Sequence, residues 1–160
     1  MAQDGTMTIE ISYATEADID DVASLFEQYR SFYGKAPTHD ARTFLEERVA
    51  GGQSLVLVAR DGYRVVGFAQ AYRAFDSIRL AHEWILTDLF VDGAARGRRV
   101  GGGLVDALVT SARDNGAHAV IVETEADNGY AHRLYESRGF EQARDTGRSV
   151  RYALHLRDHH

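Results

Sequence analysis

The chain reads Leu89-Phe90-Val91-Asp92-Gly93-Ala94-Ala95-Arg96-Gly97-Arg98-Arg99-Val100-Gly101-Gly102-Gly103-Leu104 where an apolar, β-prone run passes through a loop into a helical pattern. Each Gly in the first helical turn disfavours the helix by about 1 kcal/mol relative to Ala. Arg98 and Arg99 stand near the positive end of the helix dipole, which disfavours cations. Both penalties are explained if exposed backbone N–H groups and the arginines bind a polyanion. The stretch therefore predicts a phosphate site between a strand and a helix.

The patterns on either side of this stretch predict an α/β protein (mixed α+β), with a central, mostly antiparallel twisted sheet and one βαβ unit. Thr15-Glu16-Ala17-Asp18 resembles a capping box, and Asp61-Gly62 is a strong hairpin signal. The expected order is βααβββαβαβ(β), in one domain over 1–160 with flexible termini at 1–6 and 157–160. Strands are expected at 8–13, 54–60, 64–72, 84–91, 119–122 and 150–156. Four helices are expected: one from Thr15 with an apolar stripe to Tyr33, one over about 40–49, one from the Gly/Arg loop to about Asn115, and one from Asp127 or Asn128 to Gly139.

Composition excludes several classes of protein. A chain of 160 residues with 44% hydrophobic and 26% charged residues is long enough for one domain with a sizeable core. The formal net charge of −6 argues against broad nucleic-acid binding. The absence of cysteine excludes disulfides and thiolate chemistry. Because neither a signal-peptide pattern nor a long apolar span is present, we expect a cytoplasmic protein without a membrane partner.

Two common nucleotide-binding patterns fail at the Gly/Arg loop. A P-loop would need Gly-Lys-Ser or Gly-Lys-Thr at its end, but Gly102 is followed by Gly103 and Leu104. A dinucleotide fingerprint would need Gly where Asp106 stands. The anion is therefore not assigned by either motif.

Two sequence blocks are similar to those of the GNAT superfamily of N-acetyltransferases. Arg96-Gly97-Arg98-Arg99-Val100-Gly101-x-x-Leu104 resembles the superfamily's acyl-CoA loop and directly follows an apolar strand. Asn128-x-x-Ala131-x-x-Leu134-Tyr135-x-x-x-Gly139-Phe140 resembles its later helix block. The resemblance extends over nearly the whole chain, because the order of strands, helices and hairpin also agrees. It implies an acetyl-CoA-dependent N-acetyltransferase without a metal.

The resemblance also implies roles for individual residues. Tyr135 would protonate the departing thiolate as a general acid, and the backbone N–H of Val91 would stabilise the oxyanion. Asn128 and Ala131 would line the cofactor on a second side, and the backbone of Leu89 to Val91 would pair with the pantetheine arm as an added strand. The residues expected to bind acetyl-CoA are Leu89, Phe90, Val91, Arg96, Gly97, Arg98, Arg99, Val100, Gly101, Gly102, Asn128, Ala131 and Tyr135, with the amides from Arg96 through Gly102 around the pyrophosphate.

The acceptor is less well defined by the sequence. The segments 29–33 and 84–91 most resemble the diamine and polyamine N-acetyltransferase branch, but Thr87 stands where that branch often has a glutamate. Asp88 and Glu123 are the candidate bases, and an ordered water is a third possibility. Strand alternation places Thr87 and Asp88 on opposite faces. Tyr33 is a candidate aromatic wall for a cationic amine.

The expected reaction is direct transfer of an acetyl group to a primary amine, either a small polyamine-like molecule or the lysine side chain of a peptide. Alternatives are a non-catalytic acyl-CoA-binding module and an acyltransferase with another acyl donor or a hydroxyl acceptor. Simpler interpretations also exist for three features: a solvated arginine loop, a core position for Tyr135 and a pure helix cap for Asn128. The seven histidines show no metal-binding spacing. By resemblance, the protein is expected to be a homodimer.

Overall fold

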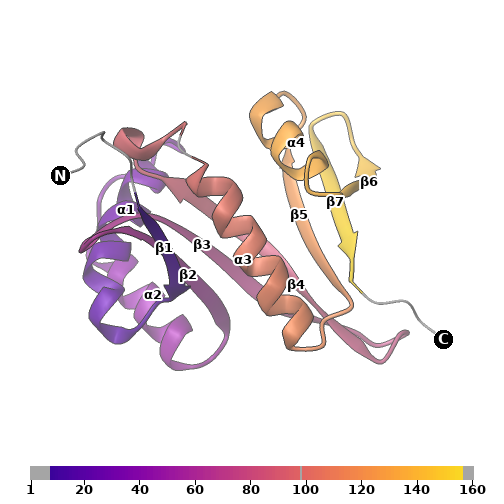
Figure 1. Ribbon diagram of the computed structural model, residues 1–160, viewed down its shortest axis with the longest axis horizontal. Helices are drawn as coiled ribbons and strands as arrows, with labels where there is room; N and C mark the ends of the chain where they lie inside the picture. Colours follow the sequence, from indigo (N-terminus) through magenta and orange to yellow (C-terminus); the bar gives the residue numbers. More distant parts are fainter. Residues whose placement is uncertain (1–7, 98, 157–160) are drawn as a thin grey trace. The chain divides into compact units, whose positions relative to one another are not determined.

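A computed structural model describes residues 8–97 and 99–156 (Figure 1). The termini predicted to be flexible and Arg98 lie outside the described residues. The elements are β1 (Ile9–Tyr13), the 3-10 turn η1 (Glu16–Asp18), α1 (Ile19–Ser31), α2 (Asp40–Ala50), β2 (Ser54–Asp61), β3 (Arg64–Asp76), β4 (Ala81–Val91), the 3-10 turn η2 (Gly93–Ala95), α3 (Val100–Asp114), β5 (Ala119–Glu125), α4 (Gly129–Glu136), β6 (Glu141–Asp145) and β7 (Ser149–His155).

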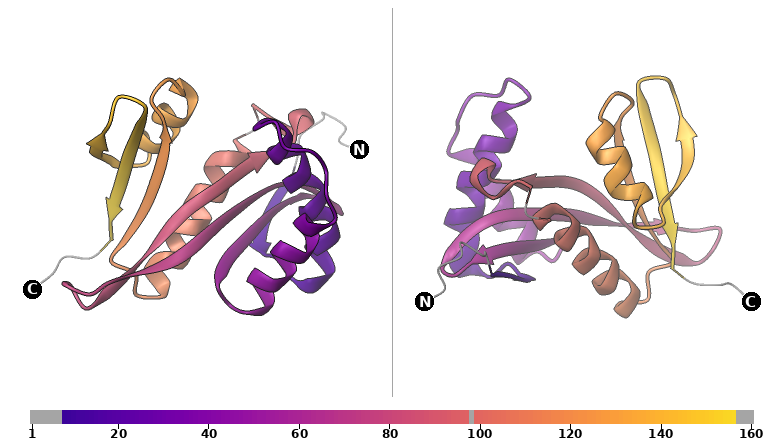
Figure 2. Two further views of the ribbon diagram at one scale, coloured as in Figure 1. Left: turned by 180° about the vertical axis from the view of Figure 1, so that it is seen from behind. Right: turned by 45° about the horizontal axis from the view of Figure 1, so that its top comes forward.

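The strands form a seven-stranded sheet with the order β1-β2-β3-β4-β5-β7-β6. The pairs β1–β2, β5–β7 and β6–β7 are antiparallel, whereas β4 and β5 are parallel. Helix α3 connects these two parallel strands, as Figure 2 shows. The predicted fold class, its element order and its βαβ unit are confirmed.

The chain divides into two compact units, of which the first comprises the residues up to Gln70 together with Asp88–Val105. Its core is apolar because the inward faces of α1 and α2 meet those of three strands. Thr15 and Asp18 begin the helical segment as predicted, since the Thr15 N–H donates to the Asp18 carboxylate at 2.8 Å. The core residues are Val22, Ala23, Leu25, Leu45, Val56, Val58, Val65, Phe68 and Phe90, with Ala14, Phe26, Tyr29 and Val49 partly buried against them.

The second unit comprises Ala71–Thr87 and the chain from Asp106 onward. Ala119, Ile121 and Ala153 form a small buried cluster against Ile85. Tyr152 of β7 is fully buried. The short, continuously apolar run that predicted β5 is explained by this burial.

Two expectations about elements are corrected. Tyr33 was predicted to continue the apolar stripe of the first helix, but α1 ends at Ser31 and the Tyr33 side chain is 59% exposed. Strand β6 was not assigned to residues from the sequence. Its residues Glu141–Asp145 are all exposed, so they have no apolar alternation to detect, and the strand exists through its pairing with β7.

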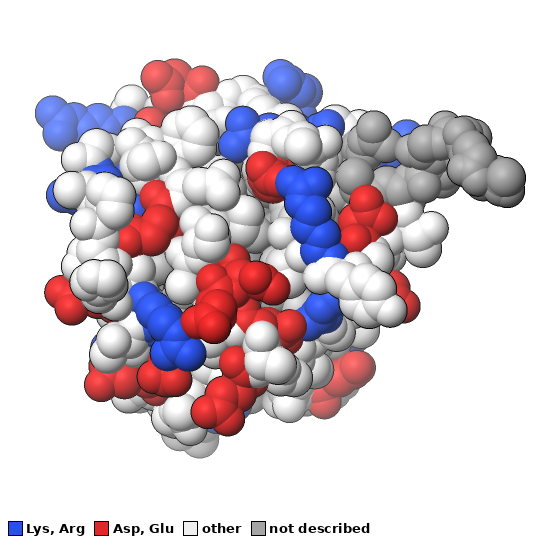
Figure 3. Space-filling model, turned by 90° about the vertical axis from the view of Figure 1, so that its left-hand side faces the viewer, with Lys and Arg blue, Asp and Glu red and all other residues white. Residues whose placement is uncertain are grey.

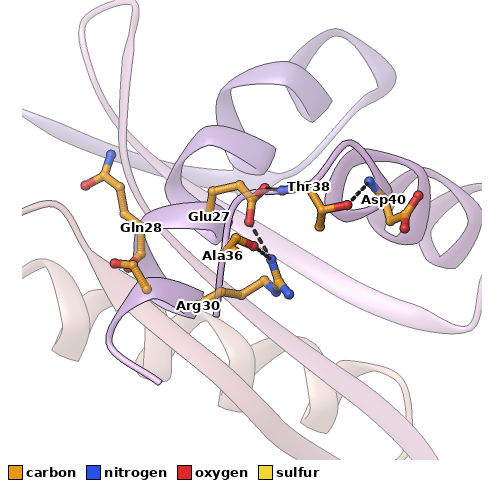
Figure 4. Close-up of polar contacts among 7 residues, drawn as sticks. Glu27, Gln28, Arg30, Ala36, Thr38 and Asp40 are labelled. Atoms are coloured by element: carbon orange, nitrogen blue, oxygen red, sulfur yellow. Dashed lines mark hydrogen bonds and ion pairs between the residues drawn. The ribbon is translucent and has the colours of Figure 1, made fainter. Parts of the chain in front are cut away.

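A polar network orders the loop between α1 and α2 (Figure 4). The Glu27 carboxylate accepts hydrogen bonds from the Arg30 guanidinium at 2.7 Å and from the backbone N–H of Thr38 at 2.6 Å. Arg30 also donates to the carbonyl of Ala36 at 3.1 Å. These bonds lower the pKa of Glu27, so the carboxylate stays ionised and the loop stays tied to α1.

Charged side chains of both signs are intermingled on the face of the molecule that Figure 3 presents. The helices α1 and α2 contribute ion pairs of the same mixed kind, such as Arg42 with Asp20 at 2.5 Å and with Glu46 at 3.1 Å. No helix among the described residues is long and apolar enough to span a membrane.

Candidate active site

The Gly/Arg loop links β4 to α3 through an exposed backbone in the left-handed region. Gly97 has a φ of 79° and Arg99 a φ of 63°. Helix α3 begins at Val100, and the Gly103 N–H donates to the Arg99 carbonyl at 3.0 Å. An ideal Cβ on Gly97 would meet nothing within 4 Å, so there is open space beside the backbone. Open space beside a helix N-terminus is a feature that favours the binding of an anion.

The glycines of this region have a second role that the sequence did not indicate. A Cβ on Gly103 would lie 2.9 Å from Cδ1 of Ile11. A Cβ on Gly67, in β3, would lie 3.1 Å from the carbonyl oxygen of Phe90 and 3.3 Å from side-chain atoms of both Leu104 and Val100. Close packing of the first turns of α3 therefore explains part of the glycine content that was attributed to phosphate binding alone.

The Arg96 side chain contacts residues at the end of β4. Its Nε donates to the carbonyl oxygen of Val91 at 3.0 Å. Its guanidinium lies over the rings of Phe32 and Phe90, at 5.6 Å and 5.4 Å from their centroids. Although Arg96 is exposed, its side chain therefore has defined partners.

The backbone of Leu89 to Val91 lies beyond the part of β4 that pairs with β5. Within the described residues, the β4–β5 register runs from Glu83 opposite Ala119 to Leu86 opposite Val122. Strand β4 itself continues to Val91. This part of β4 is extended backbone outside the β4–β5 register, the kind of strand edge to which an extended ligand can add.

Asp88 is the centre of a polar cluster in the first unit. The side-chain amide of Gln70, which is fully buried in β3, donates to the Asp88 carboxylate at 2.9 Å. The hydroxyl of Ser54 donates to the Gln70 amide oxygen at 3.0 Å, which fixes the orientation of that amide. Tyr29 of α1 hydrogen-bonds to Asp88 as well. Burial raises the pKa of Tyr29, and the charge of Asp88 raises it further, so Tyr29 donates as a neutral phenol.

The other acceptor-site candidates differ from Asp88 in exposure. The Thr87 side chain is exposed and Asp88 is half-buried, as expected from strand alternation. Glu123 is exposed on β5, opposite Arg151 in the β5–β7 register. The structure thus brings Asp88, Gln70 and Tyr29 together.

Gln70 was missed from the sequence. The available signal was a single amide within the apolar run from Val65 to Ala71 of a predicted strand. Such an amide must find buried partners, but the sequence does not show which ones.

Helix α4 carries the second block of predicted residues. The Asn128 side chain accepts from the Ala131 N–H at 3.1 Å, so Asn128 caps the helix. Tyr135 is 5% exposed, with its ring centroid 5.6 Å from Phe140 and 6.0 Å from Tyr152. The Tyr135 ring is therefore packed in the interior of the second unit, which is compatible with either interpretation of this residue. Burial raises the pKa of Tyr135, so the phenol keeps its proton at neutral pH.

The histidines differ in their surroundings. His118 is buried, with Nε2 3.3 Å from the Glu83 carboxylate and 3.7 Å from that of Asp76. His132 contacts Tyr152 and the carbonyl of Ala126. Among the described residues, no group of three His, Cys, Asp or Glu side chains is arranged to hold a metal ion.

Comparison with known proteins identifies the family. The family model of the acetyltransferase (GNAT) family matches residues 20–140. The N-acetyltransferase YhfO of Bacillus subtilis strain 168, itself uncharacterised, is 38% identical over 149 residues, which cover 92% of this chain and 98% of that protein. A crystal structure of a probable acetyltransferase is 36% identical, with a TM-score of 0.79 over 84% of this chain and 91% of the other.

A third similar structure is that of yncA from Salmonella typhimurium, solved with its cofactor acetyl-CoA. It has a TM-score of 0.76 and covers 96% of both chains, and at 24% identity the likeness is one of fold. The match of the family model and the likeness to YhfO show that the chain belongs to the GNAT family of acetyltransferases. It is an N-acetyltransferase whose acyl donor is acetyl-CoA.

The loop fits this donor. Gly97 and Arg99 are exposed beside the first turn of α3, and a helix N-terminus together with a guanidinium is chemistry that suits a pyrophosphate. When bound, acetyl-CoA supplies an activated thioester carbonyl for attack by an amine. The chain's own residues have to orient that carbonyl, remove a proton from the amine and donate a proton to the departing thiolate.

Proposed function

We propose that this enzyme transfers the acetyl group to the primary amine of a cationic acceptor, either a small polyamine-like molecule or a lysine side chain. The observation that supports this proposal is the Asp88 cluster. Gln70 and Tyr29 both donate to the half-buried carboxylate and fix its orientation. An ionised carboxylate attracts an ammonium group and can take a proton from it before attack.

Tyr29 and Tyr33 add an aromatic surface to this acceptor subsite. Their ring centroids are 5.4 Å apart with an interplanar angle of 71°, and Tyr33 is largely exposed. Aromatic faces attract ammonium groups, and an exposed ring is available for that contact. The network of Glu27 and Arg30 supports the position of Tyr33, whose N–H donates to the Arg30 carbonyl at 2.9 Å.

The remaining roles belong to the donor side of the reaction. We assign the oxyanion contact to the backbone N–H of Val91 and the protonation of the departing thiolate to Tyr135. The phenol of Tyr135 is protonated at neutral pH, as a general acid for the departing thiolate has to be. Asp88 is preferred to Glu123 as the base, since Asp88 is held by two neutral donors and Glu123 is exposed.

The decisive experiment is a thiol-release assay with acetyl-CoA against polyamines, amino acids, aminoglycosides and lysine peptides. We expect turnover with polyamines or lysine peptides. In Asp88→Asn, the KM for the amine should rise at least tenfold while the KM for acetyl-CoA is unchanged, because the charge that attracts the ammonium is removed. The matched control is Glu123→Gln, which should leave both constants within about twofold.

Three results would count against these proposals. Equal effects of Asp88→Asn and Glu123→Gln on the amine KM would remove Asp88 from the acceptor site. A Tyr135→Phe variant with wild-type kcat between pH 6 and 9 would show that this phenol does not protonate the leaving group. Binding of acetyl-CoA without turnover on any amine would favour a non-catalytic module over the proposed reaction.

A further inference from the structure

Helix α4 is joined to β7 by a chain of three short hydrogen bonds. The Nδ1 atom of His132 lies 2.6 Å from the hydroxyl oxygen of Tyr152. The Nε2 atom of the same ring lies 2.9 Å from the carbonyl oxygen of Ala126. The Tyr152 hydroxyl in turn donates to the Glu136 carboxylate at 2.5 Å. The chain therefore runs from a loop carbonyl through an imidazole and a phenol to a carboxylate.

Counting protons in this chain gives a definite result. A carbonyl oxygen only accepts, so Nε2 of His132 must carry a proton for its contact. The Tyr152 hydroxyl donates to the Glu136 carboxylate, so with Glu136 ionised the proton between Tyr152 and Nδ1 comes from the imidazole. A neutral imidazole, a phenol and a carboxylate together carry one proton too few for all three contacts. The three side chains therefore share one additional proton.

The surroundings of Tyr152 indicate which side chain carries the additional proton. Tyr152 is fully buried, and its burial together with the Glu136 carboxylate raises the pKa of its hydroxyl, so the phenol is not ionised. From β6, the Gln142 side chain hydrogen-bonds to the same hydroxyl and the Asp145 carboxylate adds negative charge. Tyr135 packs against the Tyr152 ring from α4. Because an imidazole is more basic than a carboxylate, the additional proton belongs on the ring of His132 rather than on Glu136.

We propose that His132 is an imidazolium in the folded enzyme, and that the His132–Tyr152–Glu136 chain is a proton-dependent device that positions α4. The helix carries Asn128 at its N-cap and Tyr135 in its last turn. When the imidazolium loses its proton as the pH rises, one contact of the chain has to be lost, and α4 is held less firmly against β7. These are positioning residues; only their effect on catalysis rests on the proposed role of Tyr135.

Nitrogen-15 NMR of the His132 ring tests the proton count directly. In the wild type at pH 7 we expect both ring nitrogens to show the chemical shifts of protonated nitrogen. In Glu136→Gln, which keeps an acceptor for Tyr152 but removes the charge, we expect one protonated and one bare nitrogen. A neutral imidazole in the wild type at pH 7, or an unchanged imidazolium in Glu136→Gln, would overturn the proposal. The control is Glu141→Gln, an exposed carboxylate on β6 that should leave the spectrum unchanged.

Hydrogen exchange then tests the positioning role. The Ala131 N–H, which donates to Asn128, should exchange about tenfold faster in Glu136→Gln than in the wild type, since a charge-assisted contact of α4 is lost. In the wild type the same increase should appear with rising pH, over the range in which the NMR spectrum shows the loss of the ring proton. Unchanged exchange of Ala131 in Glu136→Gln would refute the positioning role.

Activity provides a separate readout. The kcat of the wild type should fall as the ring loses its proton, and Glu136→Gln should show a lowered kcat without that step. A wild-type kcat that stays constant across this range would refute the link to catalysis. Because neither the NMR nor the exchange experiment measures turnover, they can succeed even if Tyr135→Phe shows that the proposed acid is wrong.

Discussion

Arg99 has a backbone conformation that is unfavourable for a residue with a side chain. Its φ of 63° lies in the left-handed region, which costs an L-residue about 1–2 kcal/mol and costs Gly nothing comparable. Glycine would therefore be the expected residue at this position of the loop. The side chain is exposed, so packing contacts do not offset this backbone strain. A guanidinium that contacts a bound anion is a reason to retain it.

We expect Arg99→Gly to be more stable than the wild type by about 1 kcal/mol, because the backbone strain is relieved. Its KM for acetyl-CoA should rise severalfold, since a charge beside the pyrophosphate is lost. The matched control, Arg99→Ala, removes the charge and keeps the strain, so its KM should rise without a gain in stability. Urea unfolding and steady-state kinetics measure the two effects, and equal stability of both variants would contradict the strain argument.

At the scale of elements, the close approach of α3 to β3 depends on small residues. Gly67 faces the Phe90 carbonyl and the side chains of Val100 and Leu104, all within 3.3 Å of an added Cβ. Gly103 faces only the terminal methyl of Ile11. A backbone carbonyl cannot move aside cheaply, whereas the end of an isoleucine side chain can rotate. The two glycines should therefore respond differently to the same substitution.

We expect Gly67→Ala to lower the free energy of unfolding by about 1–3 kcal/mol, the usual cost of overpacking. Gly103→Ala should change stability much less, because the gain of about 1 kcal/mol in helix propensity offsets the movement of Ile11. Adding Ile11→Val, which removes the clashing methyl, should reveal that gain. Urea unfolding of the four proteins measures the series. A Gly103→Ala variant that is as destabilised as Gly67→Ala would contradict this distinction.

At the scale of the whole molecule, binding of the donor should stabilise the fold by mass action. Acetyl-CoA at a hundred times its Kd should add about 2.7 kcal/mol. For a chain of this length, each kcal/mol raises Tm by about 2–4 °C, so we expect an increase of about 5–10 °C. Acetyl-pantetheine, which lacks the pyrophosphate, is the matched control and should give a much smaller shift at the same concentration. Equal shifts for the two ligands, measured by differential scanning calorimetry, would argue against a pyrophosphate site in the Gly/Arg loop.

The sequence was most informative where a requirement is local. The capping box at Thr15 and the hairpin at Asp61-Gly62 depend on neighbours a few residues apart, and both elements formed as predicted. The Gly/Arg loop and the Asn128 block were also recognisable, since each is a contiguous pattern. Strand β6 was not assigned because its exposed residues carry no apolar period, and its existence depends on a partner strand.

The acceptor site shows the opposite case. Asp88 was a candidate from the sequence, but so were Glu123 and a water molecule. The partners of Asp88 are Gln70 from β3 and Tyr29 from α1, which are separated from it by many residues of chain. The chain of His132, Tyr152 and Glu136 likewise joins α4 to a strand that is not adjacent to it in sequence. Such contacts have no local signature.

The amino-acid sequence by itself determined the family, the acyl donor and the order of the elements, because these depend on local conformational preferences and on contiguous motifs. The tertiary structure alone decided which carboxylate is held by Gln70 and Tyr29, why Gly67 and Gly103 have no side chain, and how many protons the hydrogen bonds of His132, Tyr152 and Glu136 require. The physical reason is that burial, steric contact and hydrogen-bond pairing depend on distances between atoms, which are fixed only when segments distant in the sequence pack together.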